Sequence, residues 1–224
     1  MDSAAVTVRP AAPRDLSSLA GVMARAFVDD PVFSWMLPSR AVRERRLAHY
    51  FSTALRHEAP GHENLELAWT DNRIVGGTIW FPPPGRYIPS ASHQLRALLG
   101  YLAVFRGRLG VGQAYMRSAL SAHPREPHWY LGFVGVEPEL QGQGIGAELI
   151  RSRLSRCDSG DEAAYLESSN VRNNRLYMHL GFRPTGVLPL PAGAPEVTTM
   201  WRPPPGAPAP PAPSGAAVVR PEGP

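Results

Sequence analysis

A glycine-rich stretch stands where the chain passes from an apolar strand to a helix. Gln141-Gly142-Gln143-Gly144-Ile145-Gly146 follows the apolar run 129–136 and precedes an amphipathic segment that begins at Ala147. The first N–H groups of a helix have no intrahelical partners and carry partial positive charge. Glycine lets an anion approach them because it has no Cβ. The stretch therefore predicts an anion cradle, and a pyrophosphate is the anion that we expect.

Two common phosphate-binding motifs do not match this stretch. A Walker loop ends in Gly-Lys-Ser or Gly-Lys-Thr, and a dinucleotide fingerprint reads Gly-x-Gly-x-x-Gly with an acidic residue about 20 positions later. The spacing in this chain is Gln-x-x-Gly-x-Gly. Because glycine-rich turns also serve as plain connections between a strand and a helix, the stretch needs a second signal.

That second signal lies one helix and one strand further along the chain. Asn170, Tyr177, Gly181 and Phe182 follow the pattern Asn-x₆-Tyr-x₃-Gly-Phe. Gly181 also suits the left-handed position that closes a helix. Two independent blocks in this order are a stronger signal than either block alone.

Together the two blocks resemble the acetyl-CoA signature of the GNAT superfamily of N-acetyltransferases. The likeness extends over about residues 5–202 and is most specific over 123–183. It implies a mixed α/β fold, with a central twisted sheet that is splayed between its fourth and fifth strands and flanked by helices. Within the superfamily, the segments 123–127 and 134–138 are similar to the puromycin N-acetyltransferase type. Asp30 replaces the tyrosine of that type, so the acceptor stays open.

The resemblance also implies a reaction, in which acetyl-CoA donates its acetyl group directly to an amine in a ternary complex, without a metal. Backbone groups of Val134 and Val136 would pair with the pantetheine arm, and the Val136 N–H would stabilise the oxyanion. Tyr177 would protonate the leaving thiolate, or would only anchor the core. Asn170 would cap a helix, with or without a bond to the pantetheine amide. The implied cofactor-binding residues are Val134, Val136, Gln141, Gly142, Gln143, Gly144, Ile145, Gly146, Ala147, Asn170 and Tyr177.

Glu167 is the first candidate for the general base, because it ends the strand beside the expected splay. It would act directly or through water. Asp30 and His128 are weaker candidates, and an amine that arrives neutral would need no dedicated base. The predicted catalytic residues are Tyr177, Glu167 and Val136.

The acceptor pocket is expected near the first helices, where three aromatic side chains and one carboxylate would suit a cationic small molecule. These residues are Phe27, Asp30, Phe33 and Trp35, and ordinary core packing is an equally good interpretation of them. A small-molecule amine is the favoured acceptor. Protein N-termini or lysines are the alternative within the same chemistry. A module that binds acyl-CoA without turnover is a different class, against which the intact Tyr177 and Asn170 argue.

Hydrophobic spacing predicts the elements that position these residues. A short strand at residues 6–8 precedes a helix that begins at Asp15 and that Pro31 ends. A second helix covers residues 40–58, and its charge run at 43–46 is expected on a solvated face.

The middle of the chain predicts a hairpin and two helices. Residues 65–70 and 74–81 alternate as an antiparallel pair around Asp71-Asn72-Arg73. An insert at 92–122 carries two helical patterns. Its apolar residues are expected in the core rather than in the wall of the acceptor pocket: Leu95, Leu98, Leu99 and Leu102 in the first pattern, and Val111, Tyr115 and Leu120 in the second. Glu137 and Glu139 flank a proline in a loop, and we expect both to be solvated.

A strand at 163–168, a helix at 172–180 and two final strands complete one domain over residues 1–202. Residues 203–224 are mostly Pro, Ala and Gly and contain too few large apolar residues to order themselves, so we expect a disordered tail. The chain is expected to act as a monomer or a homodimer.

Composition limits the remaining classes. Of 224 residues, 43% are apolar, and the net charge of +4 comes from scattered arginines rather than from a basic block. This charge suits an anionic cofactor and does not indicate nucleic acid. The single cysteine, Cys157, cannot form an intramolecular disulfide and is expected as a packing residue. With no signal peptide and no membrane span expected, we predict a cytoplasmic protein.

Overall fold

A mixed sheet forms the centre of the computed structural model, which describes residues 6–59, 61–83 and 90–207. Within that part of the chain the sheet has seven strands in the order β1-β2-β3-β4-β5-β7-β6. The strands are β1 (Thr7–Pro10), β2 (Leu65–Thr70), β3 (Arg73–Phe81), β4 (His128–Val136), β5 (Ala163–Ser168), β6 (Arg183–Val187) and β7 (Thr198–Arg202). Only β4 and β5 are parallel neighbours, and the other pairs are antiparallel.

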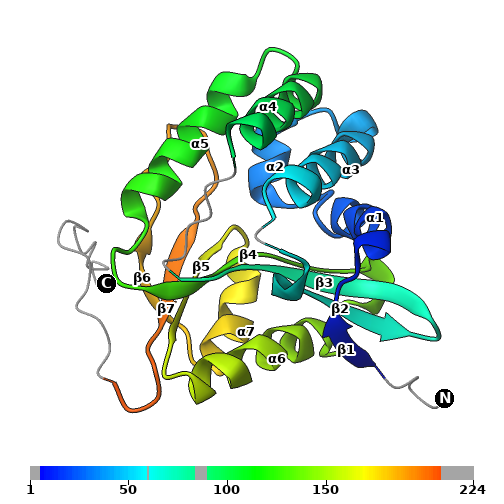
Figure 1. Cartoon of the computed structure of the whole chain (residues 1–224). Coiled ribbons are helices and arrows are strands. Elements are labelled where there is room, and N and C mark those ends of the chain that lie inside the picture. Colours follow the sequence, from blue (N-terminus) through cyan, green and yellow to red (C-terminus); the bar gives the residue numbers. More distant parts are fainter. Residues whose placement is uncertain (1–5, 60, 84–89, 208–224) are drawn as a thin grey trace, which may run out of the picture.

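Helices cover both faces of the sheet. In Figure 1, α1 to α5 lie on one face, and α6 and α7 lie on the other. Their bounds are α1 (Leu16–Ala26), α2 (Pro31–Met36), α3 (Arg40–His57), α4 (Ala91–Phe105), α5 (Leu109–Ala122), α6 (Ile145–Ser159) and α7 (Asn174–His179). Short 3₁₀ turns occupy Pro13–Asp15, His62–Asn64, Pro138–Leu140 and Val171–Asn173. The mixed α/β architecture agrees with the prediction.

The sheet opens between β4 and β5. Their parallel pairing joins residues 128–131 to residues 163–166, although β4 continues to Val136. On its other side, β4 carries a bulge at Gly132, because Ile79 pairs with Phe133 while Trp80 pairs with Leu131. The last residues of β4 therefore have no strand partner toward β5, which confirms the predicted splay between the fourth and fifth strands.

The hairpin of β2 and β3 is confirmed, and its turn explains the pairing. Asp71 and Asn72 have φ angles of 45° and 63°, which is the left-handed region that a tight hairpin turn needs.

Gly181 is also left-handed, with a φ of 89°, directly after the last turn of α7. Cys157 is fully buried on α6, and burial raises the pKa of its thiol to about 12, as suits a packing residue.

Pro31 begins a helix instead of only ending one. The first helix stops at Ala26, and Pro31 is the first residue of α2, where its missing N–H has no cost. Asp30 is the N-cap of α2 and accepts a hydrogen bond from the Phe33 N–H at 3.0 Å. This small helix turns Asp30 toward the carboxyl end of β5.

Two charged side chains that were expected in solvent are buried. Arg43 is 6% exposed, and its guanidinium donates to the carbonyl oxygens of Leu37 and Val28 at 2.7 and 2.8 Å. Glu137 is 1% exposed. In both cases a long-range partner offsets the loss of water, and such a partner cannot be recognised from local sequence. Glu139 is exposed, as expected.

The leucines of α4 are not in the core. This helix packs on α3 through Ala97, Val104 and Phe105, which form a neighbouring stripe of the same helix. The four leucines face outward, with exposed fractions of 43% to 59%: Leu95, Leu98, Leu99 and Leu102. The prediction that they are core residues is therefore wrong, and so is that for Leu120 of α5, which is 47% exposed, whereas Val111 and Tyr115 are partly buried against the core. α4 is apolar on more than one face, and the sequence alone does not say which face meets α3.

Two further expectations concern the membrane and the tail. No helix among the described residues is both long and apolar enough to span a bilayer. The last strand, β7, ends at Arg202, and residues 203–207 continue without a helix or strand. The rest of the predicted disordered tail, residues 208–224, lies outside the described residues.

Candidate functional site

The glycine stretch forms a loop that leads into α6. Gly142 and Gly144 have φ angles of 76° and 87°, and a Cβ added at either would meet no atom within 4 Å. Gly144 is the N-cap of α6, and the first helical bond runs from the Glu148 N–H to the Gly144 carbonyl at 3.0 Å. The N–H groups before Glu148 thus lack helical acceptors in a loop that is open above its glycines. An anion such as a pyrophosphate fits this surface.

The open end of β4 presents backbone groups to the splay. The Glu137 N–H donates to the Val75 carbonyl at 2.8 Å, and in the same register Val136 pairs with Gly76 and Val134 with Thr78. An antiparallel ladder alternates hydrogen-bonded and non-hydrogen-bonded residue pairs. Because Glu137 and Val75 form a hydrogen-bonded pair, Val136–Gly76 and Val134–Thr78 are non-hydrogen-bonded pairs. Their N–H and C=O groups point away from β3, toward the side where β5 has left the sheet.

Gln141 has a local partner in this arrangement. Its Nε2 donates to the Val136 carbonyl at 3.1 Å, so it ties the glycine loop to the end of β4. Gln143 is exposed, as are Gly142 and Gly144, whereas Ile145 and Ala147 are buried against the sheet. The loop therefore offers a cofactor its backbone rather than a wall of side chains.

Glu137 anchors the residue that follows Val136. Its carboxylate accepts hydrogen bonds from Arg25 Nε at 2.9 Å and Arg25 Nη2 at 2.6 Å, and one from Arg73 at 3.3 Å. The bonds from Arg25 hold the pKa of Glu137 below its usual value. The ion pair joins α1 to the open end of β4 and so fixes the direction of the Val136 N–H.

Glu167 sits at the carboxyl end of β5, inside a group of tyrosines. Its carboxylate accepts hydrogen bonds from the hydroxyls of Tyr115 at 3.3 Å, Tyr165 at 3.3 Å and Tyr130 at 3.5 Å. Burial raises the pKa of Glu167 to about 7, and the three phenols act against that rise. A carboxyl group of this kind both holds and releases a proton near neutral pH.

Asp30 reaches the same end of β5 from the turn between α1 and α2. It accepts a hydrogen bond from the Ser169 hydroxyl at 2.5 Å, two residues after Glu167. Burial raises the pKa of Asp30, while its bonds from Ser169 and Phe33 lower it. The structure thus brings Asp30 and the end of β5 together, although 139 positions separate the two hydrogen-bonded residues.

Tyr177 and Asn170 lie beyond β5, on the other side of the sheet end. Tyr177 is 6% exposed and packs edge-on against Phe182, with ring centroids 6.2 Å apart. Burial, followed by the charge of Asp30, raises the pKa of Tyr177 above its ordinary range, so the phenol keeps its proton at neutral pH. Asn170 caps the turn before α7, where its side chain accepts from the Arg172 N–H at 3.1 Å.

The expected acceptor residues are divided between a core and its edge. Phe33 is 5% exposed and lies in an aromatic cluster in which Phe27 contacts both Phe33 and Phe133, with ring centroids 5.7 Å apart in each pair. Phe27 and Trp35 are half-buried against this cluster. His128 lies at the opposite end of β4 from Val136, where its ring packs against His123. The His128 ring also packs against Tyr165, one of the tyrosines that bind Glu167, with ring centroids 5.5 Å apart.

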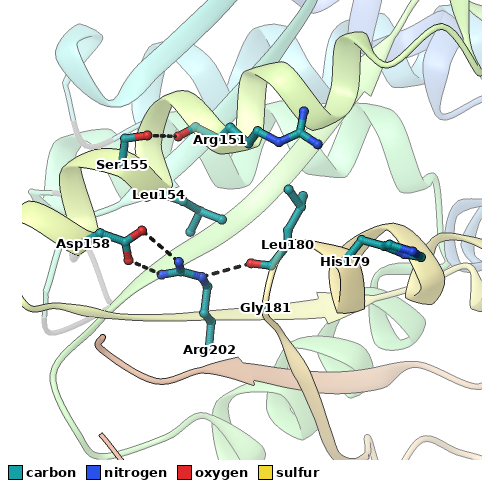
Figure 2. A pocket seen from close by; sticks show the side chains of 8 residues that line it. All are labelled: Arg151, Leu154, Ser155, Asp158, His179, Leu180, Gly181 and Arg202. Atoms are coloured by element: carbon teal, nitrogen blue, oxygen red, sulfur yellow. Dashed lines mark hydrogen bonds and ion pairs between the residues drawn. The ribbon is translucent and has the colours of Figure 1, made fainter. Parts of the chain in front are cut away.

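A separate hollow lies between α6 and α7. Figure 2 shows Arg202 on its floor, donating to both carboxylate oxygens of Asp158 at 2.6 and 2.9 Å and to the Leu180 carbonyl at 3.0 Å. This hollow is near the carboxyl ends of both helices, whereas the glycine loop is at the amino end of α6. The Arg202–Asp158 ion pair joins β7 to α6. Because the hollow lies at the opposite end of α6 from the glycine loop, it is not part of the anion cradle.

The comparisons with known proteins agree with this geometry. The sequence profile of the Acetyltransferase (GNAT) family matches residues 27–182. The chain belongs to the GNAT acetyltransferase family. It is 26% identical, over 178 residues, to an uncharacterized N-acetyltransferase of Schizosaccharomyces pombe, which covers 75% of this chain and 71% of the relative.

Solved GNAT structures superpose on nearly the whole chain. The Corynebacterium glutamicum structure described as histone acetyltransferase HPA2 and related acetyltransferase has a TM-score of 0.68 at 29% identity, and the match covers 89% of this chain and 96% of that one. The polyamine N-acetyltransferase of Drosophila melanogaster has a TM-score of 0.57 at 16% identity over 89% and 100% of the chains, which shows the fold alone. GNAT enzymes use acetyl-CoA, and this chain is a GNAT acetyltransferase.

Sequence reasoning missed the three tyrosines around Glu167. Tyr165 had a usable signal, because it stands two residues before Glu167 on a strand and so shares its face. Tyr130 follows from the parallel register, in which it pairs with Tyr165. Tyr115 had no local signal, since it reaches Glu167 from the insert between β3 and β4.

Among the described residues, no group of three or more metal-ligating side chains is present.

Proposed function

We propose that this acetyltransferase moves an acetyl group from acetyl-CoA to an amine of a small molecule, by direct attack in a ternary complex. The observation that carries the proposal is Glu167, a half-buried carboxyl bound by three tyrosine hydroxyls, with a pKa of about 7, at the end of the strand that borders the splay. A base with a pKa near the working pH is well matched to removing a proton from an amine.

The backbone supplies the acetyl-CoA site in this proposal. The unpaired N–H groups at the start of α6 hold the pyrophosphate, and the open edge of β4 pairs with the pantetheine arm. The Val136 N–H points into the splay and stabilises the charge that develops on the acetyl oxygen. Asn170 and the loop after β5 border the arm on its other side.

Proton transfer is divided between two side chains. Glu167 accepts the proton that the amine loses, directly or through a water. Tyr177 donates a hydrogen bond, and then its proton, to the thiolate as the C–S bond breaks. The usual pKa of a phenol, about 10, keeps it protonated at pH 7; because a thiol has the lower usual pKa, about 8.5, the transfer is uphill, and the phenolate regains a proton from solvent. The raised pKa of Tyr177 keeps it in the donor form.

We test the acetyl-CoA site with Gly144→Glu. A glutamate at this left-handed position adds strain and a negative charge at the helix start, so we expect acetyl-CoA affinity to fall by at least ~10-fold in a calorimetric titration. Gly107→Glu is the matched control, because Gly107 also has a φ of 87° and open space beyond its Cα but lies between α4 and α5. Equal affinity in both variants, or no binding by the wild-type protein, would refute the site.

Asp30 and the aromatic edge form the acceptor side in this proposal. A carboxylate within mostly apolar surroundings favours a cationic acceptor. Asp30 would bind a second ammonium group of that acceptor, one that is not acetylated. The Drosophila relative in fold catalyses the formation of N-acetylagmatine, so agmatine and polyamines are sensible first amines to screen by thiol release.

Asp30→Asn tests that role. Asparagine still caps α2, so the fold is expected to stay intact while the charge is lost. We expect the KM for a diamine to rise about 10-fold, equivalent to about 1.4 kcal/mol, with little change for a monoamine. Steady-state kinetics with a diamine and a monoamine of equal length measure the difference. Equal changes for both amines would show that Asp30 does not bind the second charge.

Several finer features remain our proposals. They are the single domain over residues 1–202, a cytoplasmic location, a monomer or homodimer, and a likeness to the puromycin N-acetyltransferase type. Protein N-termini or lysines are the alternative acceptors, and a screen with short peptides beside small amines separates the two. If the protein binds acetyl-CoA but none of the tested amines or peptides causes release of the thiol, the protein is instead the non-catalytic module.

A further inference from the structure

We propose that Tyr115, on α5, is a positioning residue for Glu167. Together with Tyr130 and Tyr165 it fixes the carboxylate in the splay and sets the pH range in which Glu167 accepts a proton. This inference rests on the proposed function, in which Glu167 is the general base. It assigns a role in the active site to α5, the second helix of the insert between β3 and β4.

The three phenols occupy both oxygens of the carboxylate. The hydroxyls of Tyr115 and Tyr130 donate to Oε2 of Glu167 at 3.3 and 3.5 Å, and the Tyr165 hydroxyl donates to Oε1 at 3.3 Å. They come from three elements: α5, β4 and β5. The side chain of Glu167 is thus held from more than one direction, which limits its rotamers.

The phenols favour the charged form of Glu167. Burial raises the pKa of each of the three tyrosines, so each keeps its proton and serves as a donor at neutral pH. A donor stabilises a carboxylate more than a neutral carboxylic acid. Burial of Glu167 acts in the opposite direction. The balance of these two effects gives the pKa of about 7.

Tyr115 differs from the other two phenols in its surroundings. Tyr130 and Tyr165 are part of the sheet and pack with Trp201 in a buried cluster. Tyr115 stands on α5, outside the sheet, and the Ser118 hydroxyl of the same helix donates to the Pro189 carbonyl at 2.8 Å. The charges of Glu167 and Asp30 both act on Tyr115, so its phenol lies near both carboxylates of the proposed acceptor site.

Other titratable groups lie around this cluster. Asp30 and Tyr50 face Tyr115, and His123 and His128 pack against the rings of the two sheet tyrosines. Because a histidine titrates in the same pH range as Glu167, a rate profile alone does not assign a shift to the carboxyl group. The experiment therefore needs a direct signal from Glu167.

The test is Tyr115→Phe, which removes one hydroxyl and keeps the ring. Loss of one donor raises the pKa of Glu167, so the acid limb of kcat/KM is expected to move up by roughly 0.5 to 1 pH unit. At pH 6 the variant is then several-fold slower than the wild-type enzyme, at pH 9 the difference narrows to the loss caused by looser positioning of the carboxylate, and acetyl-CoA affinity is unchanged. Tyr101→Phe is the matched control, because it removes a phenol bound to a different carboxylate, that of Glu58.

A second measurement does not depend on turnover. In protein labelled with ¹³C at the glutamate carboxyl carbons, the Glu167 resonance is identified by its loss in Glu167→Gln, and its titration is followed in the wild-type protein and in Tyr115→Phe. An upward shift in Tyr115→Phe but not in Tyr101→Phe supports the proposal. An unchanged Glu167 titration would overturn it.

The two measurements also separate this inference from the proposed function. If Glu167→Gln keeps full activity, Glu167 is not the base and the proposed function loses that step, whatever the resonance of Glu167 does. If Glu167→Gln is inactive and Tyr115→Phe has a wild-type profile and titration, the base is correct and the role of Tyr115 is wrong.

Discussion

Glu167→Gln is expected to lower kcat at pH 7.5 by about 100-fold or more, with acetyl-CoA affinity within about twofold of the wild-type value. General base catalysis is typically worth about 10²- to 10⁴-fold, and glutamine keeps the size of the side chain without its basicity. The cofactor loop and the open edge of β4 do not involve this side chain, so acetyl-CoA binding is both a folding control and a site control.

The pH dependence of kcat/KM tests the same role of Glu167. Below its pKa of about 7, Glu167 carries a proton and cannot accept another, so the kcat/KM of the wild-type enzyme falls as the pH falls through that value. The residual rate of Glu167→Gln should lack this limb and follow only the ionisation of the amine. A variant whose rate equals the wild-type rate at high pH would mean that the amine arrives neutral and needs no dedicated base.

Much of the cofactor side of the fold could be predicted from the sequence, because its determinants are local. The glycines stand between an apolar run and an amphipathic helix, so the N-terminus of α6 and its left-handed glycines follow from a few adjacent residues. The hairpin of β2 and β3 follows in the same way from alternation and the turn at Asp71 and Asn72.

The acceptor side was harder to predict, because its determinants are separated in the sequence. Glu137 was expected in solvent, and it is buried because Arg25 and Arg73 reach it from two other elements. Tyr115 comes to Glu167 from an insert whose docking no local pattern fixes. Pro31 was expected only to stop a helix, yet proline is equally suited to begin one, and the second role puts Asp30 beside Ser169.

The leucines of α4 show that local sequence also does not predict which face of a helix is buried. Hydrophobic periodicity identified α4 and α5 as helices, and both are present. It did not identify the buried face, because α4 has apolar residues on two faces, with Ala97, Val104 and Phe105 on one and the four leucines on the other. The close approach to α3 is made at Gly100, where an added Cβ would lie 2.6 Å from the Thr53 side chain.

Tyr177→Phe is expected to lower kcat by at least ~10-fold while acetyl-CoA still binds. The substitution keeps the ring that packs against Phe182 and removes only the hydroxyl, so the hydrophobic contacts are expected to persist. What is lost is a proton for the leaving thiolate. Single-turnover measurements with preformed enzyme and acetyl-CoA isolate this step from cofactor binding, and Tyr101→Phe again controls for removing a partly buried phenol elsewhere.

The raised pKa of Tyr177 makes the same assignment testable by pH. Because burial and the nearby Asp30 disfavour the phenolate, Tyr177 stays protonated as the pH rises through its ordinary value. The wild-type rate should therefore show no loss from Tyr177 up to pH 9, and the ratio of wild-type to variant rates should be constant from pH 7.5 to 9. An unchanged kcat in Tyr177→Phe would leave Tyr177 as a core residue of α7 and would move the proton donor to another group or to water.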